Sequence, residues 1–585
     1  MKIRVHLRET ENEMIYRFGE FAVDTLRAEV CLAGKTVPLR RQSFDVLVYL
    51  LQRPHRIVSK DELLNAVWGN KFVTDGALKH CVMEIRAAIG DREHRVVRTV
   101  ARRGYVLEAR VTKQSVAADD GVSILVVPIA DQSTDVNGDY IADGLTDEII
   151  TELSKVRSLR VIARASAMRL KGADNAVQDI ARKLGVDFIL EGSVRKWGDR
   201  LRVNLQLSRL GSDAARWSEH YDGNLGDLFE IQDEIARSVA EELAIHLGAP
   251  EQTNDDELED PRAIEAYLRA RYETQRFSRE SLQQAERHLM NGLDLVGPNP
   301  RLLSALGHAY AKYSELGLDP TGEFIAKAAE CAEKVFEFDP QSSRAHLLLG
   351  MVRFFSGELR AARAPLERSL DTYPADPDAL ALLGYLCALS GQNERALQLF
   401  GEALDVDPLT PLNHCMPGFV AVMEGRYADA LPHYRRFLEL DPKNPFAIWT
   451  WSYVLLRNGR VDEASEAVRE LSAEHARTPL AQLGAALFYG VCGKAEAARE
   501  AVTDELRAAA RNSELLSREL THSLALAGET DEALDWLENT VRIGNINYPF
   551  WAQHNEWVSS VRGHSRFDAI MRDVEREWIS VASFS

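Results

Sequence analysis

The stretch TDGALKHCVMEIRAAIG, residues 74–90, decides how the N-terminal part of the chain folds. Leu78, Val82, Ile85 and Ile89 follow one another at intervals of three or four residues, the spacing of an apolar stripe on an α-helix. The residues off this stripe include charged and polar side chains. The spacing therefore predicts a helix over 75–89 whose outer face either reads a nucleic acid or is ordinary solvated surface.

The segments around this helix come in an informative order. Two strand-like runs occupy residues 16–39, and helical patterns follow at 43–54 and 59–69. After the helix at 75–89, residues 95–109 alternate like two strands folded about a tight turn. Strands, three helices and a terminal hairpin are the order of a winged helix-turn-helix.

Four spaced motifs add a family resemblance. LRRQSFDVLVYLL, SKDELLNAVWG, the V-T-D-x-A-L…I-R-x-x-I-G-D run and RTVARRGYVL resemble the OmpR/PhoB-type winged-helix output domain, over about residues 16–109. The resemblance implies that the helix at 75–89 lies in the DNA major groove and that the hairpin at 98–105 reaches a minor groove. It also implies that Trp68 and the loop before the helix contact the phosphate backbone.

The side chains expected to contact DNA lie on the helix, the loop before it and the hairpin. They are Trp68, Thr74, Lys79, His80, Met83, Glu84, Arg86, Arg98, Thr99, Arg102 and Arg103. Met83 and Glu84 depart from the family, because these positions are often basic in it. The Glu84 carboxylate is able to accept from a cytosine amino group, but it would also repel phosphate.

Charge is distributed unevenly along the chain. Residues 1–110 carry 20 Lys/Arg and 14 Asp/Glu, a net of +6, so the formal charge of -19 leaves -25 for the remainder. A basic N-terminal part on an acidic body indicates that the N-terminal part meets a polyanion. The longest apolar run, 122–130, is far shorter than the roughly 20 residues of a membrane helix. Six scattered cysteines are typical of reduced thiols, so we expect a cytoplasmic protein without membrane contact.

Strand-like and helical patterns alternate over residues 121–248, after an expected linker at 111–121. This alternation predicts a small α/β domain, and phrases such as YIADGLTDEIITELSK and IARKLGVDFILEGSVRK resemble the TolB N-terminal-like segment. Asp143, Asp147 and Glu148 cluster within it. They either complement the dipole of a helix N-terminus, which we favour, or belong to a metal site. We find no catalytic or cofactor-binding motif.

A 34-residue period occupies residues 262–548. Pro340, Pro374, Pro408 and Pro442 keep it, as do series of glycines and alanines. A 34-residue period of helix pairs, with small residues at fixed positions, is typical of the tetratricopeptide repeat. We therefore predict an all-α solenoid over 262–548, followed by a capping segment at 549–585.

Solenoids of this kind present a concave groove that holds a peptide or a partner helix. Side chains near the middle of the first helix of each repeat either line this groove or pack between neighbouring repeats. They are Met351, Tyr385, Phe419, Trp449 and Tyr453.

The domain order resembles that of HilA/CadC-like regulators without a membrane span. It predicts a one-component transcriptional regulator: residues 1–110 bind double-stranded DNA, and the rest senses a ligand or binds a protein. Two copies would bind two half-sites. One alternative is a scaffold whose winged helix no longer binds DNA, supported only by Glu84. The other is an adenylate-cyclase-like enzyme, for which the sequence leaves no room for a catalytic domain.

Overall fold

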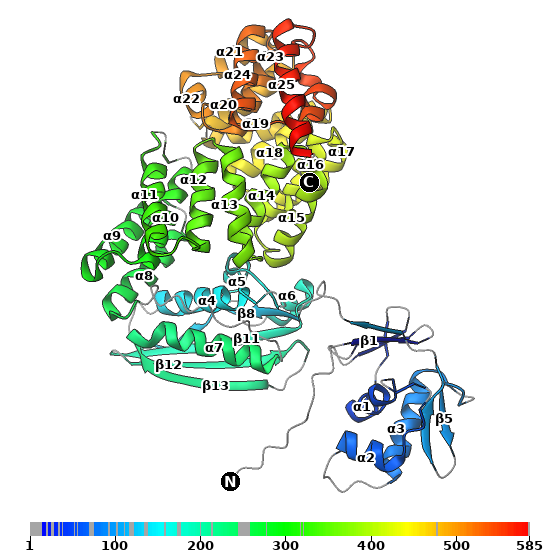
Figure 1. Cartoon of the computed structure of the whole chain (residues 1–585). Coiled ribbons are helices and arrows are strands. Elements are labelled where there is room, and N and C mark those ends of the chain that lie inside the picture. Colours follow the sequence, from blue (N-terminus) through cyan, green and yellow to red (C-terminus); the bar gives the residue numbers. More distant parts are fainter. Residues whose placement is uncertain are drawn as a thin grey trace. The chain divides into compact units, whose positions relative to one another are not determined.

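The protein is described by a computed structural model and forms two compact units, residues 1–121 and 122–585 (Figure 1). The structure describes residues 14–582 apart from 19–20, 25–28, 33–34, 38, 52, 55, 69–74, 92–93, 101–102, 110–111, 116–121, 134–138, 157–158, 172–176, 199, 212–214, 244–257, 277, 316–317, 320 and 476–477. Within these residues, no helix is both long and apolar enough to cross a membrane.

The first unit combines an antiparallel sheet, three helices and a hairpin. Its elements are β1 (Met14–Phe18), β2 (Phe21–Asp24), β3 (Glu29–Leu32), β4 (Lys35–Val37), α1 (Arg41–Leu51), α2 (Lys60–Trp68), α3 (Asp75–Ala88), β5 (Val97–Val100), β6 (Gly104–Leu107) and β7 (Thr112–Ser115). The sheet has the order β4-β3-β2-β1-β7, and β5 pairs with β6 separately. The winged helix-turn-helix expected from the sequence is present.

The three helices pack on one another around a shared apolar core. The stripe on α3, including Leu78, Val82 and Ile85, is buried there with Leu47 of α1 and Leu63 of α2. Burying a large aliphatic side chain stabilises a fold by about 1.5–3 kcal/mol, so this stripe fixes the orientation of α3. The opposite face of α3 points away from this core.

One segment differs from the expectation. Residues 112–115, which were expected to belong to a linker, form β7 and pair with β1, with Met14 opposite Ser115. Their sequence, TKQS, has no apolar alternation that would have predicted a strand, and β7 is the last strand in the sheet order. The first unit therefore continues beyond residue 110.

The second unit begins with an α/β module. Its elements are β8 (Val122–Val126), β9 (Ala130–Asp131), α4 (Asp139–Ser154), β10 (Leu159–Val161), α5 (Arg164–Met168), α6 (Val177–Leu184), β11 (Phe188–Trp197), β12 (Arg200–Arg209), β13 (Ala215–Asn224), η1 (Leu225–Asp227) and α7 (Leu228–Glu242). The mixed sheet has the order β10-β8-β11-β12-β13, parallel at its first two pairs and antiparallel at its last two.

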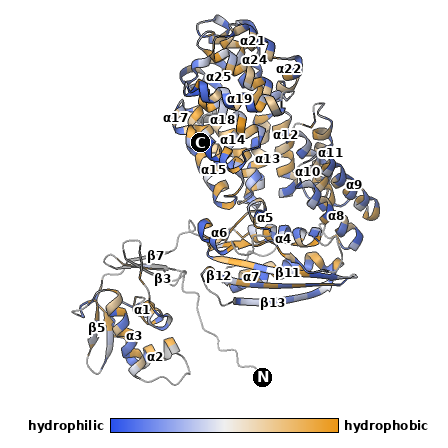
Figure 2. Ribbon diagram, turned by 180° about the vertical axis from the view of Figure 1, so that it is seen from behind, coloured by the Kyte–Doolittle hydropathy of each residue, from blue (hydrophilic) through white to orange (hydrophobic). Residues whose placement is uncertain are grey.

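Paired helices make up the rest of the second unit. They are α8 (Pro261–Thr274), α9 (Arg279–Val296), α10 (Pro300–Glu315), α11 (Glu323–Phe338), α12 (Ser343–Phe355), α13 (Leu359–Thr372), α14 (Pro377–Leu389), α15 (Asn393–Val406), η3 (Pro411–His414), α16 (Met416–Met423), α17 (Tyr427–Leu440), α18 (Pro445–Arg457), α19 (Val461–His475), α20 (Pro479–Val491), α21 (Ala495–Ala501), α22 (Asp504–Ala510), α23 (Glu514–Leu526) and α24 (Thr530–Ile543). The chain ends with η4 (Phe550–His554), η5 (Glu556–Val558) and α25 (Ser565–Ala582). Figure 2 shows hydrophobic and hydrophilic residues interleaved along these helices, as amphipathic packing requires.

The periodic glycines mark places where two helices come close. A Cβ on Gly350 would lie 2.6 Å from the Leu366 side chain, and one on Gly384 would lie 2.6 Å from the Phe400 ring. In these two repeats, only a glycine therefore allows the first helix to pack this closely on the second. The 34-residue repeats predicted from the sequence are confirmed.

The α/β module and the repeats form one compact unit instead of two separate domains. Helix α4 packs on α8, where the Leu268 side chain fills the space above Gly144. A second junction joins α5 to the end of α15, where the Ala163 N–H donates to the Val406 carbonyl over 2.6 Å. The module is thus attached to the repeats at two places.

Candidate nucleic-acid interface and inner face of the repeats

Helix α3 presents the outward face that the sequence predicted. Lys79 and His80 are exposed, and Met83 is 59% exposed although it is apolar. Neither Lys79 nor His80 makes an ion pair with any residue that the structure describes. A helix with a buried stripe and a bare outer face has the dimensions that fit a DNA major groove.

Glu84 does not belong to this bare face. The Ser43 hydroxyl donates to its carboxylate over 2.6 Å, and the Arg40 guanidinium lies 3.6 Å away. Glu84 therefore holds the N-terminal end of α1 against α3. This contact gives an acidic residue on α3 an internal role and removes the one sequence feature that favoured a scaffold.

Arg86 also turns inward. Its Nε and NH2 groups donate to the Val97 carbonyl over 2.9 and 2.6 Å, and NH2 donates to the Thr99 hydroxyl over 2.8 Å. Three hydrogen bonds from one guanidinium tie α3 to β5. The structure thus places Arg86 and Thr99 in the support of the hairpin, whereas the sequence had suggested that both touch DNA.

Two further contacts hold the hairpin. The Asp91 carboxylate accepts from the Arg95 and Val97 N–H groups over 2.7 and 2.8 Å. Burial alone would raise the pKa of Asp91, but these backbone hydrogen bonds outweigh burial and lower it. The base of β6 pairs with Val58, and a Cβ on Gly104 would lie 1.9 Å from the Val58 carbonyl oxygen, so this position requires glycine.

The remaining candidates of the hairpin and loop divide into three groups. Arg98 pairs with Glu108 across the hairpin at 2.6 Å, and Arg103 is exposed at the turn. Trp68 ends α2, but its side chain lies outside the description. Thr74 and Arg102 lie outside the described residues altogether. Lys79, His80 and Met83 on α3 and Arg103 at the hairpin turn are thus the candidates that the structure shows as exposed and without an ion pair to a described residue.

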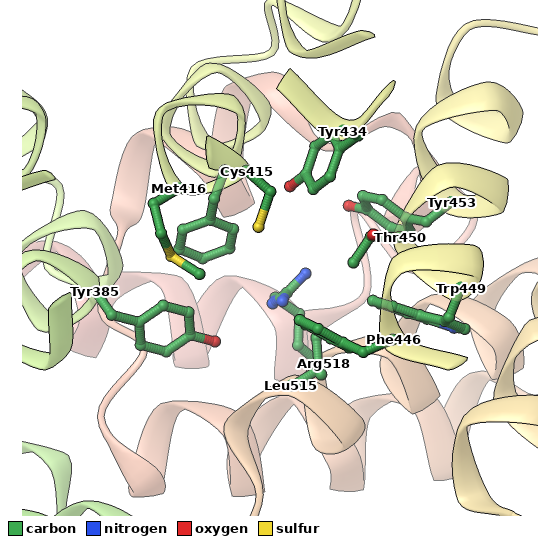
Figure 3. Close-up of a pocket in the computed structure, with 11 residues that line it drawn as sticks. Tyr385, Cys415, Met416, Tyr434, Phe446, Trp449, Thr450, Tyr453, Leu515 and Arg518 are labelled. Atoms are coloured by element: carbon green, nitrogen blue, oxygen red, sulfur yellow. The ribbon is translucent and has the colours of Figure 1, made fainter. Parts of the chain in front are cut away.

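The first helices of successive repeats form what we call the inner face of the repeats. Four of the five side chains predicted there line a small pocket of about 60 Å³ (Figure 3). Tyr385 stacks on Phe419 with ring centroids 4.8 Å apart, and Trp449 stacks on Tyr453 at 5.5 Å. The fifth, Met351, is buried.

Leu515 and Arg518 of α23 form part of the wall of this pocket. The Tyr385 hydroxyl donates to Glu514 of α23 over 2.5 Å, and the Arg518 guanidinium lies 5.5 Å from the Phe419 ring centroid. Figure 3 shows Arg518 pointing between the aromatic side chains. Tyr385 and Phe419 therefore contact α23, a helix far along the chain, which neither of the two arrangements considered from the sequence included.

We call Arg457, Glu514, Arg518, Glu519 and His522 the α23 cluster. Arg518 donates to Glu514 over 2.9 Å and to Glu519, while Arg457 lies 3.3 Å from the His522 ring nitrogen. Burial outweighs the neighbouring carboxylate and lowers the pKa of His522 to about 4, so the ring is neutral at neutral pH. The cluster contains two cationic and two anionic side chains. No sequence motif predicted it.

The acidic residues of α4 also have partners from other elements. Asp147 pairs with Arg271 of α8 and lies 3.5 Å from Arg164, and Asp143 is 2.7 Å from Lys171. Glu148 accepts from the Tyr267 hydroxyl over 2.6 Å. These contacts show that the acidic side chains of α4 are neutralised by cations of other segments, which the sequence-based interpretation by the helix dipole did not include. The described residues contain no cluster of side chains suited to a metal ion.

Glu148 is the most buried acid of this set. Arg301 of α10 donates to it over 3.0 Å. Burial alone would raise the pKa of Glu148, but the guanidinium groups of Arg301, Arg344 and Arg271 outweigh burial and lower it to about 2. We call Asp147, Glu148, Arg164, Arg271 and Arg301 the α4 cluster.

The fold and these sites define a class of protein. The first unit is a winged helix-turn-helix of the OmpR/PhoB type, which is a DNA-binding domain of transcriptional regulators, and the second unit carries tetratricopeptide repeats. Residues 34–107 match the family "Transcriptional regulatory protein, C terminal". Residues 347–411 and 421–487 each match "Tetratricopeptide repeat".

Three relatives place the chain more closely. "Putative adenylate cyclase 3" of Rhizobium meliloti (strain 1021) is 32% identical over 239 residues, 39% of this chain and 40% of that protein. "Transcriptional regulator HilA" of Salmonella typhi is 24% identical over 351 residues, 58% of this chain and 61% of that protein. "Response regulator MprA" of Mycobacterium bovis (strain BCG / Pasteur 1173P2) is 34% identical over 113 residues, 18% of this chain and 49% of that protein. The chain thus spans about half the length of these relatives.

Proposed function

We propose that the chain is a one-component transcriptional regulator. Its first unit binds double-stranded DNA, and its second unit, a TolB-like module with tetratricopeptide repeats, receives a small ligand or a protein partner. The observation that supports this most is helix α3, whose buried stripe fixes it in the core while Lys79 and His80 stay exposed. Two regulators among the relatives favour the same reading.

The described surface suggests how the contacts are divided. Lys79 and His80 meet the major groove, and Arg103 at the hairpin turn meets the minor groove, where an arginine suits the negative potential. Arg86 acts as a positioning residue, because its hydrogen bonds run to Val97 and Thr99. In this proposal the protein works in the cytoplasm, and two copies bind half-sites about 10–10.5 base pairs apart.

The enzyme alternative has narrower support. One relative carries a cyclase name, but the match covers 40% of that protein. The family matches within this chain are to a DNA-binding domain and to repeats. We therefore propose a regulator without catalytic activity, and cyclic-AMP formation by the full chain with magnesium would contradict it.

DNA binding by the full chain tests the proposal. Fluorescence anisotropy would compare a duplex from the gene's own upstream region with a scrambled duplex at two salt concentrations. We expect tighter binding to the upstream duplex and weaker binding of both at higher salt, because phosphate contacts release counterions. No binding, or binding that is insensitive to salt, would contradict the proposal.

Variants assign the contacts. Arg103→Ala should weaken binding to both duplexes and flatten the salt slope by about one unit. Lys79→Ala should cost roughly 1–3 kcal/mol, more on the upstream duplex, if it reads a base. The matched control is Arg572→Ala, which removes an exposed arginine of α25 and should leave binding unchanged.

A further inference from the structure

A cavity lies within the second unit, between the α/β module and the first repeats. It measures about 710 Å³ and is lined by α4 and α5 on the module side and by α8, α10, α12 and the start of α14 on the repeat side. Small-molecule sites commonly measure about 300–1,000 Å³ and lie between packed elements. By size and position, this cavity suits a metabolite.

Its walls carry equal numbers of acidic and basic side chains among apolar ones. The acids are Asp143, Asp147, Glu148, Glu315, Asp376, Asp378 and Asp407, and the bases are Arg164, Arg169, Arg271, Arg276, Arg301, Lys312 and Arg344. A ligand for such a cavity must itself be polar, and its charge depends on which wall groups are already neutralised.

Several of the acids are satisfied within the protein. Asp143 is 2.7 Å from Lys171, and the Ser166 hydroxyl donates to Asp407 over 2.6 Å. Asp376 caps α14 by accepting from the Ala379 N–H over 2.8 Å. Lys312, which donates to Glu315 over 2.6 Å, also lowers the pKa of Asp378. These contacts give each of these acids a hydrogen-bonding or charged partner within the protein.

The α4 cluster contains more cationic than anionic side chains. Arg164 and Arg271 share the single carboxylate of Asp147, while Arg301 bonds to Glu148. Three guanidinium groups thus meet two carboxylates. The Nε atoms of Arg164 and Arg301 are buried and have no hydrogen-bond acceptor among the described residues. Donors in this wall therefore outnumber the acceptors that the protein supplies.

A further arginine lines the cavity with this cluster. Arg169 follows α5 directly, lines the same cavity and is exposed. It makes no ion pair with a described residue. Arg164 and Arg169 thus bring two guanidinium groups from one short segment to one wall.

We propose that the cavity binds a small metabolite through an oxyanion group, carboxylate or phosphate, held by Arg164, Arg169 and Arg271. The planar guanidinium fork matches both oxyanions with two parallel hydrogen bonds, and it is more readily desolvated than an ammonium group. The inference rests on the proposed function and specifies the ligand that the second unit receives. A bound oxyanion would join α5 of the module to α8 of the repeats.

Calorimetric titration of the full chain tests this. The probes are citrate for the carboxylate source and inorganic phosphate for the phosphate source, with spermidine as a cationic control at matched ionic strength. We expect saturable 1:1 binding of at least one oxyanion and none of spermidine. No saturable binding of either oxyanion, or tighter binding of spermidine, overturns the proposal.

Two variants locate the site. Arg164→Gln with Arg169→Gln should weaken the bound oxyanion about tenfold or more, because charged hydrogen bonds are lost. Arg169→Gln alone changes an exposed side chain, so it keeps the test informative if the double variant fails to fold. Arg572→Gln is the matched control and should bind as the unaltered chain does. Equal affinity in all four proteins would place the oxyanion elsewhere and overturn the proposal.

The outcome is separable from that of DNA binding. The same preparation is measured on the upstream duplex, which contacts the first unit. Oxyanion binding without DNA binding would leave this inference standing and remove the regulator. DNA binding without oxyanion binding would do the reverse.

Discussion

The second unit holds two clusters of buried charged side chains, the α23 cluster and the α4 cluster. They differ in the balance of their charges and in the size of the cavity beside them. In the α23 cluster two cations meet two carboxylates, and the adjoining pocket measures about 60 Å³. In the α4 cluster three arginines meet two carboxylates beside a cavity of about 710 Å³. The first balances its charges internally and lies at the inner face of the repeats. The second contains guanidinium N–H groups without an acceptor among the described residues, and it lies beside the larger cavity.

The comparison shows that a solenoid need not use its whole inner face for binding. Where α23 packs on that face, the aromatic side chains are buried against it. The hydrogen bonds around Arg518 and Glu514 then join the first helices of the middle repeats to α23. Where α4 faces the repeats, the first helices of the repeats instead line a cavity with charged side chains. Buried charge therefore serves structure at one end and, in our proposal, recognition at the other.

The largest effect is expected for Arg518→Gln. The Arg518 side chain is 2% exposed, and its loss leaves Glu514 and Glu519 buried without their shared cation. Breaking a buried pair typically destabilises by about 3–5 kcal/mol. Denaturant unfolding of the full chain measures it, beside Arg572→Gln as an exposed control. A loss below about 1 kcal/mol would show that the α23 cluster does not lock the array.

The next effect is a pH dependence of the same cluster. A histidine whose folded pKa lies near 4, below its usual 6.5, binds a proton more readily when unfolded. The unfolding free energy should therefore fall as pH drops from 6.5 to 5, by about 1.5 kcal/mol from this group. His522→Asn should remove that part of the slope, since asparagine does not titrate. An unchanged slope in the variant would assign the acid sensitivity to other groups.

Arg164→Gln should have the smallest effect on stability and would sharpen the contrast. Asp147 keeps Arg271 as its close partner when Arg164 is removed. We expect a change within about 1 kcal/mol in the unfolding free energy, far below that of Arg518→Gln. A loss of 3 kcal/mol or more would mean that Arg164 is as structural as Arg518.

Local and periodic features could be predicted from the sequence. The stripe of Leu78, Val82 and Ile85 predicted α3 at 75–89, and the structure has it at Asp75–Ala88. The 34-residue period predicted the repeats. Both predictions hold because spacing along one helix, or between equivalent positions of repeats, is visible without knowing any distant contact.

Contacts between distant residues could not be predicted. Glu84 meets Ser43, which is 41 residues earlier, and Tyr385 meets Glu514, which is 129 residues later. Nothing local distinguishes a glutamate that faces DNA from one that supports α1, or an aromatic row that lines a groove from one that packs on α23. The same reason hid the partners of Asp147 and Glu148.

Hydrogen–deuterium exchange of the full chain, measured alone, with citrate and with inorganic phosphate, tests the contrast between the two clusters most directly. We predict slower exchange in α5 and in the part of α8 around Arg271 with at least one of the two oxyanions, with α23 unchanged. No protection in α5 and α8 by either oxyanion, or equal protection in α23, would contradict the account.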